Sequence, residues 1–83
     1  MKILKQLSED VAYNMQHYSQ LTIDLIEEAE DLYNYDSEDT KFGALAYKIY
    51  NVLEVIDKKR NSDIKALEML YFILINEVEG NRL

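Results

Sequence analysis

The chain has 83 residues and a net charge of −7. This length allows one small domain and no second one, because a second independent core would need roughly another 50–100 residues. The absence of cysteine excludes disulfide scaffolds, zinc ribbons and thiol nucleophiles, and the acidic balance disfavours direct contact with nucleic acid or anionic lipid. The first residues lack the apolar core and the small-residue cleavage site typical of a signal peptide, and no window approaches about 18 uncharged apolar residues. We therefore expect a single cytoplasmic domain over residues 1–83 without a membrane span.

The first part of the chain predicts one long helix. Proline is absent and only two glycines occur, so the turns of a β domain are missing and we expect an all-α fold. Apolar or small residues at helical spacing predict a helix over roughly 3–34: Leu4, Leu7, Val11, Met15, Tyr18, Thr22, Leu25, Ala29 and Leu32. Such a helix would reach about 45 Å, so the main alternative is a kink or break near His17–Gln20 that divides it into two.

A second helix is expected after the polar stretch that follows. Asp36 or Ser37 is a suitable N-cap, because a side-chain oxygen there can accept a hydrogen bond from a free first-turn amide. The helix should stop near Lys59, where basic residues suit the negative end of the helix dipole. Its apolar stripe consists of Phe42, Leu45, Ile49, Val52 and Ile56.

The last helix is expected over about 62–79, with Asn61 or Ser62 as its cap. Its segment Met69–Ile75 is apolar all the way round, which is more than one face of a helix can bury. Either the preceding helices flank this segment from both sides, or its outer face, with Phe72 and Ile73, packs on another molecule and forms a homodimer. We therefore expect a small three- or four-helix antiparallel bundle with a long or kinked first helix.

The acidic charge is concentrated in one segment. Eight acidic residues and no basic residue lie between Asp24 and Asp39, whereas the rest of the chain holds eight acidic and nine basic residues. Four of them share one stripe of the expected first helix, away from its apolar residues: Asp24, Glu27, Glu28 and Asp31. A block of one sign attracts a basic partner, although an acidic excess also keeps a small domain in solution.

Two tyrosines and three further acidic residues follow directly: Tyr33, Tyr35, Asp36, Glu38 and Asp39. Tyrosine is enriched at binding hot spots, and carboxylates beside it can occupy the phosphate sites of a basic cleft through charge-assisted hydrogen bonds. The alternative is that the two tyrosines only cover the end of the bundle. Together with the acidic stripe, these five residues form the predicted partner-binding surface.

Residues that would support catalysis or metal binding are missing. His17 has no cysteine or second histidine to complete a zinc site. The segment from Asp36 is similar to a calcium loop, but Lys41 stands where glycine is needed and Tyr47 where a bidentate glutamate is needed. We therefore expect a protein that is not an enzyme and that has no catalytic residues, cofactor or metal.

The order of the amphipathic stretches, the acidic tyrosine-containing segment and the length together resemble the small all-helical bacterial immunity proteins, which bind and neutralise a cognate toxin. The stretches are Leu21–Tyr33, Leu45–Ile56 and Leu67–Val78. The tyrosine pair of the colicin nuclease immunity family is not reproduced, because Asn34 separates Tyr33 from Tyr35 and no proline follows. The pediocin-like bacteriocin immunity bundles are similar in helix order but usually less acidic.

The resemblance implies a non-enzymatic inhibitor that binds tightly through one face, with a toxin partner encoded nearby. With the acidic surface, it predicts an immunity or antitoxin-like protein that neutralises a basic toxin, foremost a nuclease. Two alternatives stay open. One is a phage-type inhibitor that imitates nucleic acid toward a host enzyme, and the other is a structural homodimer that associates through the helix around residues 69–75.

Overall fold

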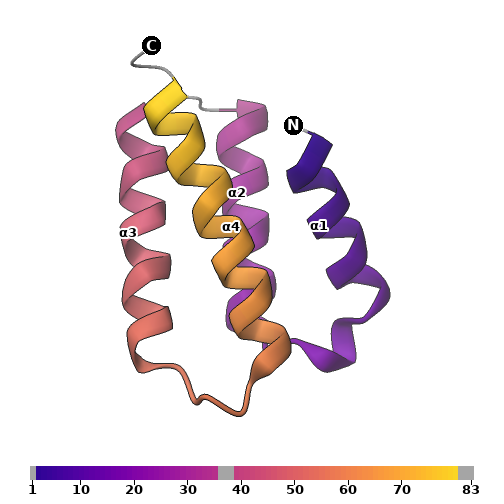
Figure 1. Cartoon of the computed structure of the whole chain (residues 1–83). Helices are drawn as coiled ribbons and strands as arrows, with labels where there is room; N and C mark the ends of the chain where they lie inside the picture. The colour runs from indigo at the N-terminus through magenta and orange to yellow at the C-terminus, as the bar shows by residue number, and fades with distance from the viewer. Residues whose placement is uncertain (1, 36–38, 81–83) are drawn as a thin grey trace.

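The computed structural model describes residues 2–35 and 39–80. Over these residues the chain forms four α-helices, namely α1 (Lys2–Tyr13), α2 (Gln20–Tyr35), α3 (Asp39–Val55) and α4 (Asn61–Gly80), with a short 3₁₀ turn, η1 (Met15–His17), between α1 and α2. Successive helices run in opposite directions and form a bundle of 37 × 26 × 17 Å (Figure 1). The expected small all-α bundle is confirmed, and the described residues contain no strand.

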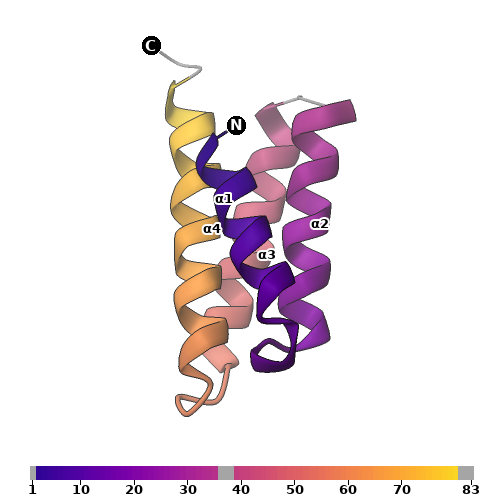
Figure 2. The same cartoon turned by 90° about the vertical axis from the view of Figure 1, so that its right-hand side faces the viewer.

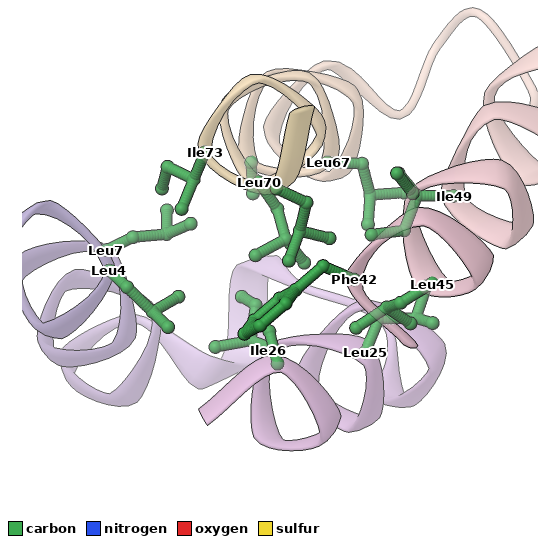
Figure 3. Close-up of a cluster of buried hydrophobic side chains, with 14 of the residues drawn as sticks. Leu4, Leu7, Leu25, Ile26, Phe42, Leu45, Ile49, Leu67, Leu70 and Ile73 are labelled. Carbon is green, nitrogen blue, oxygen red and sulfur yellow. The ribbon is translucent and has the colours of Figure 1, made fainter. Parts of the chain in front are cut away.

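The core lies where the apolar stripes of the helices meet. Phe42 of α3 is fully buried, and side chains of α2 and α4 converge on it in Figure 3. α1 packs against α2 and α4 (Figure 2) and adds three side chains to this core. The buried apolar residues are Leu4, Leu7, Val11, Leu25, Ile26, Ala29, Phe42, Leu45, Ala46, Ile49, Ala66, Leu67, Leu70, Ile73 and Leu74.

The single long first helix is wrong, and the alternative of a break is correct. Helix α1 ends at Tyr13 and α2 begins at Gln20. The side chain of Asn14 donates a hydrogen bond to the Asp10 carbonyl (2.9 Å), and Ser19 caps α2 by accepting one from the Thr22 amide at its Oγ (3.3 Å). The apolar spacing runs on through this break, but the residues there leave the stripe, and the Met15 residue is 52% exposed.

The connection between α3 and α4 begins earlier than expected. Helix α3 ends at Val55, four residues before Lys59. Asp57 explains this end, because its side chain accepts a hydrogen bond from the Lys59 amide (2.9 Å) and its carbonyl accepts one from the Arg60 amide (3.0 Å), which together form a turn. The expected N-caps of α3, Asp36 and Ser37, lie outside the described residues.

The apolar segment of α4 is only partly enclosed. Helix α4 contacts each of the other three α-helices, and Ile73 is buried and points toward Leu7 of α1 in Figure 3. Phe72 faces away from the core and is 64% exposed. The other helices therefore bury Ile73, as the first alternative expected, whereas they leave the ring of Phe72 on the surface.

Candidate partner-binding surface

The outward face of α2 carries the acidic stripe. Leu25, Ile26 and Ala29 of this helix are buried, and the acidic residues on its opposite side are exposed. Since successive helical residues are about 100° apart, these carboxylates project side by side over two turns. We call this surface the acidic face, and it consists of Asp24, Glu27, Glu28 and Asp31.

Two residues of the acidic face are held by neighbouring side chains and two are not. Glu28 forms an ion pair with Lys48 of α3, with 3.5 Å between Oε2 and Nζ. Asp24 accepts a hydrogen bond from the Gln20 side chain at 2.8 Å. Within the described part of the chain, Glu27 and Asp31 have no hydrogen bond or ion pair, so their carboxylates are accessible to a partner.

Tyr33 lies apart from the acidic face, on the side of α2 that packs into the bundle. Its ring is 4.8 Å from the ring of Phe42, and its hydroxyl donates a hydrogen bond to Glu77 of α4 (3.4 Å). Burial, together with the Glu77 carboxylate, raises the pKa of Tyr33 to about 12. These contacts fit the alternative that Tyr33 covers the end of the bundle.

The remaining predicted site residues lie at the end of α2 and beyond it. Tyr35 is the last residue of α2, is 84% exposed and lies on the same side of the helix as the acidic face. Asp39 is the first residue of α3. Asp36 and Glu38 lie outside the described residues. Of the predicted surface, the structure thus brings the four acidic residues and Tyr35 together on α2.

Basic residues of α3 border the acidic face. The sequence-based prediction did not include them. A groove of about 270 Å³ runs between α2 and α3 and is lined by Glu28, Leu32, Lys41, Ala44, Leu45 and Lys48. Lys41 and Lys48 are seven residues apart, which places them on one side of α3. This seven-residue spacing is visible in the sequence and could have predicted a basic side of α3. The surface charge therefore changes from negative to positive just beyond Glu28.

A buried carboxylate at the other end of the bundle is a second feature that the sequence reading missed. Asp63 in the first turn of α4 is 1% exposed. It accepts hydrogen bonds from the Ser19 amide (2.9 Å) and from Nε of Arg60 (2.7 Å). Burial alone would raise the pKa of Asp63, but these bonds and one from Thr22 outweigh it and lower the pKa. The network joins the starts of α2 and α4 and is structural.

His17 lies exposed in η1, and no group of three or more histidine, cysteine, aspartate or glutamate side chains within residues 2–35 and 39–80 is placed to hold a metal ion. In the same part of the chain, every helix is too short or too polar to cross a membrane.

Comparisons with protein-family models, with curated proteins and with solved structures give no match to this chain.

Proposed function

We propose that this protein is a non-enzymatic binding protein that neutralises a basic protein toxin, as immunity proteins do, and that the acidic face of α2 is its docking surface. The observation that carries the proposal is the exposed pair of Glu27 and Asp31, which have no partner within the described residues and stand on a helix fixed by the core. A rigid row of carboxylates loses little conformational entropy when it binds cationic side chains.

The arrangement of like charges supports a cationic partner. The pairs Asp24/Glu28 and Glu27/Asp31 are each four residues apart, and each destabilises the isolated helix by about 0.2–0.5 kcal/mol. A partner that supplies arginine or lysine side chains removes this repulsion. Binding to a basic surface would therefore stabilise α2 by relieving the repulsion between these carboxylates.

A nuclease is the class of toxin that fits this surface best. Its active-site cleft binds phosphates with lysine and arginine, and carboxylates can form charge-assisted hydrogen bonds with the same groups. Exposed Tyr35 beside the acidic face adds an aromatic contact of the kind that is frequent at hot spots. A phage-type inhibitor of a host nucleic-acid enzyme would use the same surface, and the identity of the bound partner separates the two.

The test compares two variants with equal charge changes. Glu27→Gln/Asp31→Asn neutralises the two carboxylates of the acidic face that have no partner within the described residues, and Glu9→Gln/Asp10→Asn neutralises two exposed carboxylates of α1. Binding to the purified product of the neighbouring gene should weaken roughly tenfold or more for the first variant, equivalent to about 1.4 kcal/mol. It should stay near wild type for the second variant.

Salt dependence provides a second readout. Association of wild type should slow as the ionic strength rises, because screening shortens the range of the attraction. If both variants bind as wild type does and binding is insensitive to salt, the acidic face is not the docking surface.

A further inference from the structure

A second open surface lies between α3 and α4, on helices that do not carry the acidic face. It is a groove of about 360 Å³ lined by Gly43, Ala46, Tyr47, Tyr50, Tyr71 and Ile75, and we call it the tyrosine groove. Tyr47 at its edge is 68% exposed. Phe72 extends the aromatic surface, since its ring packs edge-on against Tyr71 with centroids 6.1 Å apart. The groove therefore exposes several aromatic rings on one side of the bundle.

Gly43 keeps this groove open, although nothing in the described chain requires a glycine there. The residue lies inside α3, its φ is not positive, and an added Cβ would meet no atom within 4 Å. Glycine weakens a helix relative to alanine, so the helix is less stable than it would be with any small side chain at this position. A glycine at an uncrowded helix surface is useful when another backbone approaches closely.

The charged residues beside the groove are two carboxylates, Glu54 and Glu68, and one basic residue, Lys65, which lies one turn before Glu68 on α4. None of its six lining residues is charged. Exposed Glu54 lies one turn after Tyr50 on α3, and exposed Glu68 precedes Phe72 by one turn on the same side of α4. Carboxylates and the faces of aromatic rings both attract arginine and lysine side chains.

We propose that the tyrosine groove binds an amphipathic helix of a partner protein, with the apolar side chains of that helix packed over Gly43 and its lysine or arginine side chains paired with Glu54 and Glu68. A helix lying in an apolar groove with charged residues at its borders is an established mode of recognition. A second copy of this chain fits less well, because it would bring the same two carboxylates and a net charge of −7 to the interface.

The proposal does not depend on the acidic face, because the two surfaces share no residue and lie on different helices.

The experiment uses the full chain labelled with ¹⁵N and a synthetic peptide of about 18 residues, long enough to be helical, with leucine on one face and lysine at its borders. A peptide of the same composition in scrambled order serves as the control probe. The backbone amide of Gly43 should shift on addition of the amphipathic peptide and much less with the scrambled one. The chain has only two glycines, which makes this signal easy to follow.

Variants decide where the peptide binds. Gly43→Leu fills the groove and should weaken binding at least tenfold, whereas Asn51→Leu, which adds the same side chain on the exposed outer side of α3, should leave it unchanged. Tyr47→Ser provides a second test at an exposed position, in case Gly43→Leu disturbs the fold. Glu54→Gln/Glu68→Gln should weaken binding several-fold.

Three results would overturn the proposal. One is a peptide that causes no shift at Gly43, and another is equal binding by wild type, Gly43→Leu and Tyr47→Ser. The third is a dimer that dissociates on Gly43→Leu, which would show that a second copy fills the groove. If only Glu27→Gln/Asp31→Asn loses binding, the peptide binds the acidic face instead. The peptide experiment and the toxin-binding experiment on the acidic face can therefore fail independently of each other.

Discussion

The backbone amide of Ser19 donates a hydrogen bond of 2.9 Å to Oδ1 of Asp63, a residue 44 positions further along the chain. The bond fixes the start of α2 against the first turn of α4. Arg60 holds the other carboxylate oxygen at 2.7 Å. A single carboxylate therefore determines where one helix begins and how two helices meet at this end of the bundle.

Removing the charge of Asp63 should destabilise the fold. Asp63→Asn keeps the size of the side chain but loses its charge-assisted hydrogen bonds, and hydrogen bonds to charged groups contribute about 1.5–3 kcal/mol. We expect the free energy of unfolding to fall by about 2 kcal/mol in urea denaturation. Asp10→Asn, at an exposed position of α1, should stay within about 0.5 kcal/mol of wild type. Equal midpoints for the two variants would contradict the structural role of Asp63.

The same carboxylate predicts a difference in acid stability. The pKa of Asp63 is lowered from 3.8 in the folded protein, so the unfolded chain takes up its proton first as the pH falls. The stabilisation is complete above about pH 5 and is lost as the pH falls below 3.8 toward the folded pKa. The stability gap between wild type and Asp63→Asn should thus be constant near neutral pH and shrink in acid, measured by urea unfolding. A gap that widens in acid would reverse the sign of this argument.

Tyr33 predicts a late step in alkaline titration. Its pKa rises from 10.0 to about 12 in the folded protein, so its neutral form stabilises the fold fully below pH 10. That stabilisation is lost between pH 10 and about 12. Ultraviolet absorbance should show one tyrosine that ionises near pH 12, and Tyr33→Phe should remove this step. Circular dichroism over the same range reports whether the chain is still folded. If no tyrosine ionises near pH 12, Tyr33 lies in solvent and the prediction is wrong.

Gly43 predicts a gain in stability on substitution. Gly43→Ala should raise the free energy of unfolding by about 0.5–1 kcal/mol, because its Cβ enters open space. The melting temperature should rise by about 4–8 °C for each kcal/mol. Ala44→Gly, the reverse change at the neighbouring exposed position, should lower it by a similar amount. A loss of stability in Gly43→Ala would mean that the chain itself needs glycine at this site.

The sequence predicted the all-α bundle because helical periodicity is a local property, and the core stripes of Phe42 to Ile49 and of Leu67 to Leu74 are buried as their spacing indicates. It could not place the break after Tyr13, since apolar spacing continues through the break and Asp63, which fixes the new start, is distant in sequence. The same periodicity could have separated Tyr33 from Tyr35, because residues two positions apart on a helix point about 200° apart. Tyr33 follows Ala29 by four residues and Tyr35 follows Asp31 by four. The contacts of Tyr33 with Phe42 and Glu77 show that Tyr33 is the one that turns inward.

The long-range cap at Ser19 also bears on the order of folding. Contacts between helices that adjoin in the chain close short loops and form quickly, whereas the cap must wait until α4 has docked. Until then, only the local hydrogen bonds of Asn14 and Ser19 interrupt the helical pattern of residues 4–32. We therefore expect the corner between α1 and α2 to reach its final structure last. In stopped-flow kinetics, Asp63→Asn should therefore refold at nearly the wild-type rate and unfold faster, with a φ-value near zero; slower refolding would place the corner in the nucleus.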